Sequence, residues 1–210
     1  MYRTELKGRV AVVLGGADGV GAAVCRLLAA RGARIAVIGD DETELQDLVD
    51  ELRWVGADAV GIVSTGVDVA SVHAGVLSEV GPPDLLFVLP CTTSAGADFR
   101  MSVDSGLTAT FEALQAFVPR MAEARSGAVV TVAPFGTDAA TSAVGGAVTA
   151  LTQHVAREVA SSGVRANVVS WTPHAERVED VAFAAVYLAS DASATMTATT
   201  LDVAGTYSRL

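Results

Sequence analysis

Short apolar runs rich in β-branched residues alternate with longer segments of helical spacing throughout the chain. Nearly continuous apolar strands are typical of parallel sheets, because helices cover both faces of such a sheet. The runs predict strands at residues 9–14, 34–38, 61–67, 85–89, 128–132, 164–169 and 200–203. Right-handed crossovers between them would produce an α/β doubly wound fold, a parallel sheet of about seven strands with helices on both faces. We expect residues 1–210 to form one such domain.

The segments between the strands have the spacing of amphipathic helices. In Asp41–Gly56, apolar residues three or four positions apart fall on one helix face, namely Leu45, Leu48, Val49 and Leu52. Further helices are expected from the turn after the first strand to Ala30, after Asp68, and over about 104–124, 142–161 and 178–189. Doubly wound sheets bind ligands at the carboxyl ends of their strands, so we expect the site residues to lie there.

The composition excludes several classes of protein. A hydrophobic content of 51% and a mean hydropathy of +0.44 are incompatible with disorder. The formal net charge of -10 repels phosphate backbones, so we expect no nucleic-acid partner. The start of the chain has no apolar signal region and no later stretch is long enough to cross a bilayer, which predicts a cytoplasmic protein without membrane contact. Cys25 and Cys91 are too few for a disulfide framework and lack metal-ligand spacing.

A glycine-rich turn follows the first predicted strand, in the order Leu14-Gly15-Gly16-Ala17-Asp18-Gly19-Val20-Gly21. Gly15 permits a sharp turn, Gly19 lets backbone approach a pyrophosphate, and Gly21 lets the helix pack close to the sheet. Unpaired N–H groups at the helix N-terminus would hold the anion. The turn therefore predicts a nucleotide site formed by Gly15, Ala17, Asp18, Gly19, Val20 and Gly21. The alternative is that the glycines serve only the turn and the close packing.

The spacing Gly15-x3-Gly19-x-Gly21 resembles the TGxxxGxG turn of short-chain dehydrogenases/reductases, with Leu14 in place of the threonine. The resemblance runs nearly end to end. Its further matches are Asp68-Val69, which resembles the adenine-contacting pair of the family, and segments 127–132, 155–169, 179–191 and 201–203. The resemblance implies a Rossmann domain, a nicotinamide cofactor and assembly into oligomers. By this analogy, Asp68 and Val69 would belong to the cofactor site.

The end of the second predicted strand bears on the choice between NAD and NADP. An acid there accepts hydrogen bonds from the adenosine ribose and repels a 2′-phosphate. The NAD-selecting aspartate of the family falls on Gly39, and Asp40 follows at a position where NADP-preferring members often carry arginine. We therefore expect NAD rather than NADP, with Asp40 at the ribose. The alternative is that Asp40 is the N-cap of the following helix.

The resemblance also implies which positions carry the chemistry, and this chain departs from the family at each of them. Family members use a tyrosine as acid, a lysine that lowers its pKa, a serine that orients the substrate and an asparagine in the proton relay. These positions fall, in that order, on Thr141, Gly145, Pro134 and Gly106. The tyrosines are Tyr2, Tyr187 and Tyr207, and the single lysine is Lys7, so no alignment shift restores a Tyr-x3-Lys pair. We therefore predict no catalytic residues in this chain.

Other residues at the predicted strand ends offer different chemistry. They are Cys91, Thr92, Thr93, Asp138, Thr141, Trp171 and His174. His174 would be a base, and Cys91 a nucleophile if a nearby cation lowered its pKa. A buried cysteine is usually inert, however, and a histidine in a short loop is usually solvated. The stretches after the fourth strand and after Trp171 are shorter than in the family, so we expect reduced substrate-binding walls.

Three functions are consistent with the sequence. The first is a non-catalytic subunit that assembles with a catalytically complete short-chain dehydrogenase acting on a ketone or hydroxyacyl substrate. By family analogy, this hetero- or homo-oligomer would form through helices 104–124 and 142–161 and strand 200–203. The second is an atypical NAD(P)-dependent ketoreductase, or a non-redox enzyme, with a rebuilt site. The third is a nucleotide-sensing binding module.

Overall fold

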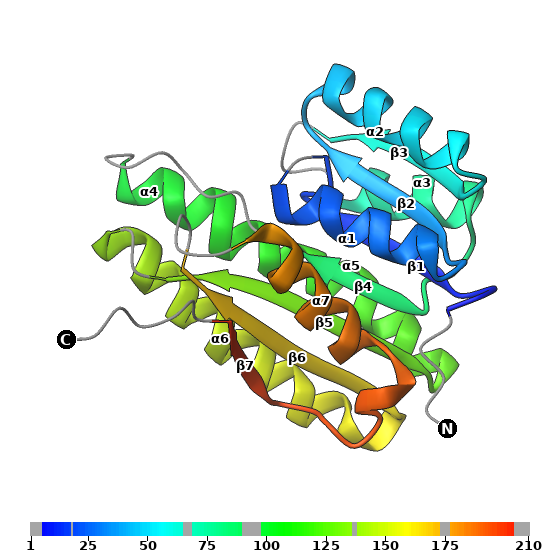
Figure 1. Ribbon diagram of the computed structural model, residues 1–210. Helices are drawn as coiled ribbons and strands as arrows, with labels where there is room; N and C mark the ends of the chain where they lie inside the picture. The colour runs from blue at the N-terminus through cyan, green and yellow to red at the C-terminus, as the bar shows by residue number, and fades with distance from the viewer. Residues whose placement is uncertain are drawn as a thin grey trace.

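The computed structural model describes residues 6–17, 19–64, 69–89, 98–135, 138–172 and 177–203. Within them, seven strands form one sheet in the order β3-β2-β1-β4-β5-β6-β7 (Figure 1). The strands are β1 (Val10–Leu14), β2 (Arg34–Gly39), β3 (Asp58–Val63), β4 (Leu85–Val88), β5 (Gly127–Pro134), β6 (Val164–Trp171) and β7 (Thr200–Val203). Every neighbouring pair is parallel. The predicted doubly wound fold is confirmed.

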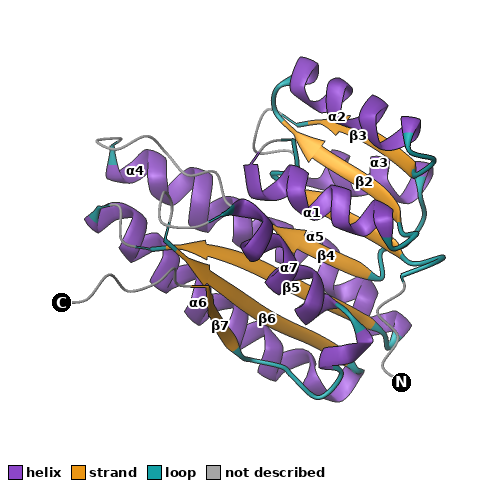
Figure 2. Ribbon diagram, viewed as in Figure 1, coloured by secondary structure: helices purple, strands orange, loops and turns teal. Residues whose placement is uncertain are grey.

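Helices cover both faces of the sheet (Figure 2). They are α1 (Gly19–Ala30), α2 (Glu42–Trp54), α3 (Val69–Glu79), α4 (Phe99–Ser102), a π-helical segment (Val103–Thr108), α5 (Ala109–Ala124), α6 (Ala139–Val159) and α7 (Val178–Ala189). One core cluster joins the sheet to α1, α2 and α7, and a second joins the opposite face to α3, α5 and α6. None of the helices in the described segments combines the length and apolar character needed to span a membrane.

The strand order reverses between β1 and β4, which are neighbours in the sheet. From β1 the chain passes through α1 on one face to β2, whereas from β4 it passes through α5 on the other face to β5. The connections that leave the carboxyl ends of β1 and β4 therefore diverge. Doubly wound sheets bind ligands in the opening that such a divergence creates.

The third strand lies earlier in the chain than its apolar pattern predicts. The pattern favours residues 61–67, whereas β3 spans Asp58–Val63. Pairing with β2 fixes this register, since Arg34 lies opposite Asp58 and Gly39 opposite Val63. Nε of Arg34 also bonds Oδ2 of Asp58 at 2.7 Å. The partner strand, rather than local apolar content, decides which residues form this edge strand.

Two helices begin earlier than expected because aspartates cap them. Helical backbone starts at Phe99, ahead of the expected 104, and the side chain of Asp98 accepts a hydrogen bond from Arg100 N at 3.2 Å. Helix α6 starts at Ala139 rather than 142, because Oδ1 of Asp138 accepts from the backbone N–H of Thr141 at 2.8 Å. An N-cap satisfies backbone donors that the apolar periodicity does not report.

Candidate functional site

A cleft of about 340 Å³ lies at the carboxyl edge of the sheet. It crosses the ends of neighbouring strands from β2 to β6, which at ~4.8 Å between strands corresponds to a length on the order of 19 Å. Its described lining residues are Gly15, Ala17, Gly19, Val20, Gly21, Gly39, Asp40, Glu44, Leu89, Val132, Pro134, Trp171 and Val178. The cleft therefore runs across the point between β1 and β4 at which the topology predicts a ligand.

The glycine turn forms the middle of the cleft. A Cβ atom at Gly15 would overlap the backbone oxygen of Leu89, and one at Gly21 would overlap the backbone oxygen of Gly15. Gly19 differs, because a Cβ there would meet no atom within 4 Å, although its φ of 47° still favours glycine. The turn thus has no space for a side chain where it packs against the sheet, but it has open space around it where α1 begins. An anion in the cleft would approach the backbone N–H groups of the first turn of α1 at this open position.

Two carboxylates mark one end of the cleft. Asp40 and Glu44 line it from the end of β2 and the first turn of α2. The alternative role of Asp40 as the N-cap of α2 is wrong, because Asp41 is the cap. Oδ1 of Asp41 accepts hydrogen bonds from the backbone N–H groups of Thr43 and Glu44 at 2.8 and 2.9 Å. Asp40 is exposed beside the cleft instead.

Close packing at Gly39 explains why the acid stands one position later than the family resemblance suggests. A Cβ atom at Gly39 would lie 2.9 Å from the Cβ of Ala17, so the glycine turn leaves no room for an aspartate there. Asp40 is the first residue beyond this contact and lines the cleft. The start of α1 and Asp40 together fit an adenosine diphosphate, with N–H groups for the pyrophosphate and a carboxylate for the ribose hydroxyls.

The other end of the cleft is apolar. Its lining residues are Leu89, Val132, Pro134, Trp171 and Val178. Their side chains carry no titratable group, and the indole N–H of Trp171 is the one polar hydrogen among them. Among the described lining residues, charge is therefore confined to the acidic end. The apolar end offers no described side chain that could give or take a proton during a reaction.

The positions that the resemblance assigns to chemistry come from three elements. Pro134 ends β5 and lines the cleft, whereas Thr141 and Gly145 belong to α6 and Gly106 to the π-helical segment. The last three are buried and are absent from the described lining of the cleft. A Cβ atom at Gly145 would overlap the backbone oxygen of Pro134 and lie 3.2 Å from the ring of Phe135. Helix α6 and strand β5 are thus packed directly against each other here.

Thr141 and Asp138 form a helix start. Oδ1 of Asp138 accepts from the backbone N–H of Thr141 at 2.8 Å, and the Thr141 hydroxyl donates to Oδ2 at 3.1 Å. Thr141 is only 7% exposed. This is the geometry of an N-cap, and it engages the hydroxyl that a rebuilt catalytic site would need.

The tyrosine and lysine that the structure describes lie away from the apolar end of the cleft. Tyr187 lies on the exposed face of α7, where its hydroxyl is 3.7 Å from the sulfur of Met196. Lys7 lies beside Gly32, which belongs to the turn that precedes β2. This turn is at the amino edge of the sheet, opposite the cleft. Tyr2 and Tyr207 lie outside the described residues.

Of the other candidate residues, some belong to the described segments and the rest lie outside them. Cys25 is fully buried on α1 near the glycine turn, and burial raises the pKa of its thiol to about 12, which makes it unreactive. Val69 begins α3 and is not among the described lining residues. No group of three or more metal-ligating side chains occurs in the described segments. Asp18, Asp68, Cys91, Thr92, Thr93 and His174 lie outside them.

Sequence reasoning missed one carboxylate of the cleft and most of its apolar end. Glu44 had a usable signal, because it lies in the first turn of the helix that follows Asp40. Leu89, Val132 and Val178 had none, since an apolar residue in a strand or helix predicts burial in the core. Only their position at the edge of the sheet makes them part of the cleft.

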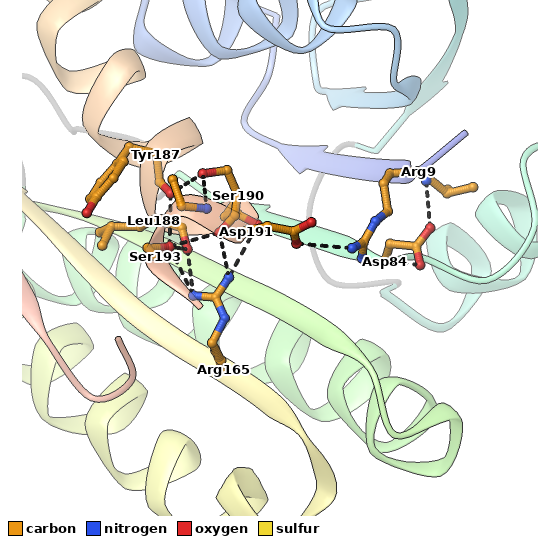
Figure 3. Close-up of polar contacts among 11 residues, drawn as sticks. Arg9, Asp84, Arg165, Tyr187, Leu188, Ser190, Asp191 and Ser193 are labelled. Carbon is orange, nitrogen blue, oxygen red and sulfur yellow. Dashed lines mark hydrogen bonds and ion pairs between the residues drawn. The ribbon is translucent and has the colours of Figure 1, made fainter. Parts of the chain in front are cut away.

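A second cavity, of about 410 Å³, lies at the amino edge of the sheet. Its most extensively bonded group is Arg165, whose guanidinium points to the carboxyl end of α7 (Figure 3). The guanidinium donates at 2.8 to 3.4 Å to the carbonyl oxygens of Leu188, Ala189, Ser190 and Met196 and to Oγ of Ser193. Arg9 pairs with Asp191 at 3.3 Å. Both arginines are thus engaged within the fold.

Comparison with known proteins finds relatives for nearly the whole chain. The family model for short chain dehydrogenases matches residues 9–181. (2S)-[(R)-hydroxy(phenyl)methyl]succinyl-CoA dehydrogenase subunit BbsC of Thauera aromatica is 29% identical, over 97% of this chain and 96% of that protein. D-threitol dehydrogenase of Mycolicibacterium smegmatis is 30% identical, over 97% and 94%. A crystal structure of a short-chain type dehydrogenase/reductase from Mycobacterium marinum has a TM-score of 0.90 at 25% identity, over 99% and 98% of the two chains.

The lengths of these alignments show that the relatives hold segments that this chain lacks. The alignment with BbsC runs over 238 residues and that with D-threitol dehydrogenase over 254, although this chain has 210. The shortened stretches expected after the fourth strand and after Trp171 are consistent with this difference.

Proposed function

Because this chain belongs to the short-chain dehydrogenase family, whose members are oxidoreductases that generally use NAD or NADP, we propose that it is a non-catalytic member that assembles with a catalytically complete relative. The observation that carries the proposal is the contact between α6 and the end of β5. Gly145 stands where the resemblance puts the lysine, and the backbone oxygen of Pro134 fills the space that its Cβ would need. A lysine there would force the two elements apart.

The neighbouring positions support the same proposal. Pro134 has no donor at the position of the serine, and Gly106 has no side chain at that of the asparagine. The hydroxyl of Thr141, at the position of the tyrosine, is engaged by Asp138. A carbonyl substrate at the apolar end of the cleft would therefore meet no described side chain that could transfer a proton to it.

The cleft supports retained binding of NAD. Backbone N–H groups near Gly19 would hold the pyrophosphate, and Asp40 would accept hydrogen bonds from the ribose and oppose a 2′-phosphate, which favours NAD over NADP. NAD supplies hydride transfer when it is bound in an active member of the family. In this chain the surrounding residues bind and orient the nucleotide but supply no proton, so we infer that NAD acts as a structural ligand.

The assembly is inferred from exposed helix surface and from a relative. BbsC is named as a subunit of its dehydrogenase. On α6, small residues at helical spacing are exposed at Ala139, Ala143, Gly146 and Ala150, and on α5 Phe111 is 44% exposed. Small outward residues let a partner helix approach closely, and an exposed aromatic ring gains from being covered. We infer that α5 and α6 contact the catalytic subunit.

Native mass spectrometry of the protein, purified under gentle conditions from its source, tests the assembly. We expect a mixed complex with a relative that retains the Tyr-x3-Lys pair. Ala150→Arg places a long charged side chain on the exposed face of α6 and should remove this partner. The matched control Ala74→Arg, on the exposed face of α3, should retain it. A homo-oligomer that is unaffected by either substitution would contradict the proposal.

Turnover assays distinguish this function from that of an atypical ketoreductase. The chain alone, given NADH and a panel of ketones and 3-oxoacyl thioesters, should cause no substrate-dependent loss of NADH absorbance. The mixed complex should cause such a loss through its partner. Turnover by the chain alone that disappears in Thr141→Ala would favour the enzyme with a rebuilt site.

A nucleotide-sensing module is the second candidate, and the cleft at the glycine turn favours it. In a sensor, Asp40→Ala should change partner binding in the presence of NAD without any effect on turnover by the chain itself. A purely supporting subunit should bind its partner equally well in this variant. Partner affinity measured with and without NAD separates the two functions.

A further inference from the structure

One wall of the cleft is an indole ring. Trp171 is the last residue of β6 and lies opposite Pro134 in the sheet. Because side chains alternate along a strand, Trp171 points to the same face as Val169, which belongs to the core cluster beneath α1 and α7. The ring packs against this cluster, partly buried, and lines the cleft together with Val178 of α7. The indole therefore lies on the side of the sheet that carries the glycine turn.

The backbone that carries the indole is held in place, and the described residues around the ring are apolar. The backbone oxygen of Trp171 accepts a hydrogen bond from Phe135 N at 2.8 Å, which ties the end of β6 to the end of β5. Leu89, Val132 and Val178 complete this end of the cleft. An indole face beside such a wall binds a planar ring by stacking. Because the π face is electron-rich, it attracts a cationic ring more strongly than a neutral ring.

The charges of the described lining residues do not oppose a cationic ring. Among the described lining residues, the charged side chains are Asp40 and Glu44, which are both acidic and lie at the far end. No described lining residue near Trp171 carries a positive charge that would repel such a ring. The nicotinamide ring is positively charged in its oxidised form and neutral in its reduced form, so the two forms of NAD differ in the property that this wall recognises.

We propose that Trp171 is the ring-binding residue of the cleft and that it gives the cleft a preference for NAD⁺ over NADH. The inference rests on the proposed function, which takes NAD as the ligand, and extends it by naming the redox state that is bound. Cation–π contacts of this kind correspond to about a 10-fold difference in Kd. The fraction of clefts that hold NAD⁺ rather than NADH would then rise with the ratio of NAD⁺ to NADH.

Tryptophan fluorescence and calorimetry provide the test, because the two tryptophans have different settings. Trp54 is 90% exposed at the end of α2, so Trp54→Phe leaves Trp171 as the single reporter without disturbing the core. Titration of this variant with NAD⁺ should quench the remaining fluorescence, which places the ligand beside the indole. Calorimetry with NAD⁺ and with NADH should give a Kd about 10-fold lower for NAD⁺.

Variants assign the preference to the indole. Trp171→Leu should bring the ratio of the two Kd values close to one, and Trp171→Phe should keep part of the preference because a phenyl ring retains a π face. In the matched control Asp40→Ala, both forms should bind more weakly and the ratio should stay unchanged, because Asp40 is about 19 Å away by strand spacing, beyond the Debye length. Circular dichroism checks the folding of each variant, and Trp171→Phe carries the test if Trp171→Leu does not fold.

Three outcomes would overturn the inference: equal Kd values for NAD⁺ and NADH, a ratio that survives Trp171→Leu, or no binding of either nucleotide. None of them alters the assembly with a catalytic relative, which native mass spectrometry reports separately. Ketone-dependent oxidation of NADH by the chain alone would overturn the proposed function instead, and the ratio of Kd values would still decide the role of Trp171.

Discussion

At the scale of single residues, two adjacent glycines in α6 have different surroundings. Gly145 is pressed against the backbone oxygen of Pro134, whereas a Cβ atom at Gly146 would meet nothing within 4 Å. Only the first glycine is required by packing. At the position that the resemblance assigns to a lysine, any side chain would therefore overlap the backbone of β5.

Alanine substitutions should separate the two glycines. Gly146→Ala should raise the free energy of unfolding by up to about 1 kcal/mol, because alanine is the better helix former. Gly145→Ala should lower it by about 1–3 kcal/mol, because the added methyl group overlaps the backbone of β5. Urea unfolding of the isolated chain, followed by circular dichroism, measures both. An increase in stability in both variants would show that α6 can move away from β5 at little cost.

At the scale of elements, α3 packs against α5 through a partly buried histidine, His73. The His73 ring meets the Phe117 ring edge-on at 4.9 Å and 82°. Nε2 of His73 is buried and finds no partner among the described residues. Burial, and secondarily the positive charge of Arg120, lower the pKa of His73. Protonation would place a second positive charge between the two helices.

The stability of the protein should therefore depend on pH through His73. Because its pKa is lowered in the folded chain, the unfolded chain takes up this proton first as the pH falls. Well above the ordinary histidine pKa of about 6.5, His73 has no effect on the pH dependence of stability. As the pH falls below this value, the lowered pKa of His73 destabilises the fold progressively. Urea midpoints between about pH 7.5 and pH 5.5 should fall less in His73→Phe than in the parent chain. The surface control His154→Gln should follow the parent, and equal slopes in all three proteins would exclude this role.

At the scale of the whole molecule, the two edges of the sheet differ in how they are built. Around the amino edge, Arg165 joins β6 to the carboxyl end of α7, and Arg9 joins β1 to Asp191 (Figure 3). The carboxyl edge carries the cleft instead, with glycines, two carboxylates and an apolar wall. Polar contacts thus hold the fold together at the amino edge, whereas the candidate ligand site lies at the carboxyl edge.

Removing the central arginine of that network should destabilise the entire fold. Arg165→Met should lower the free energy of unfolding by about 3 kcal/mol, because several backbone oxygens lose their donor. Arg165→Lys should recover little, since one ammonium group cannot reproduce the planar fork of a guanidinium. The control Arg120→Met removes an exposed ion pair and should change stability by less than about 0.5 kcal/mol. Chemical denaturation measures the free energy of unfolding of the three variants. Equal losses in Arg165→Met and in the control Arg120→Met would show that the network around Arg165 adds nothing to stability.

Local sequence patterns were sufficient to predict the fold class and to show that the chain has no Tyr-x3-Lys pair. Alternating apolar runs predict the parallel sheet, because helix and strand periodicities are properties of neighbouring residues. The lack of any Tyr-x3-Lys pair follows from the positions of three tyrosines and one lysine, which no folding can change. The single-domain organisation and the roles of Asp18, Asp68, Cys91, Thr92, Thr93 and His174 stay predictions.

The tertiary structure decided the features that depend on contacts between distant segments. Asp40 and Asp41 are adjacent and chemically identical, yet only the geometry of α2 makes one the cap and leaves the other at the cleft. Gly145 is a glycine because β5 passes against α6, and Trp171 reaches the cleft because β6 ends beside it. A sequence orders residues along one dimension, so it cannot report which of its segments will be neighbours once the chain is packed.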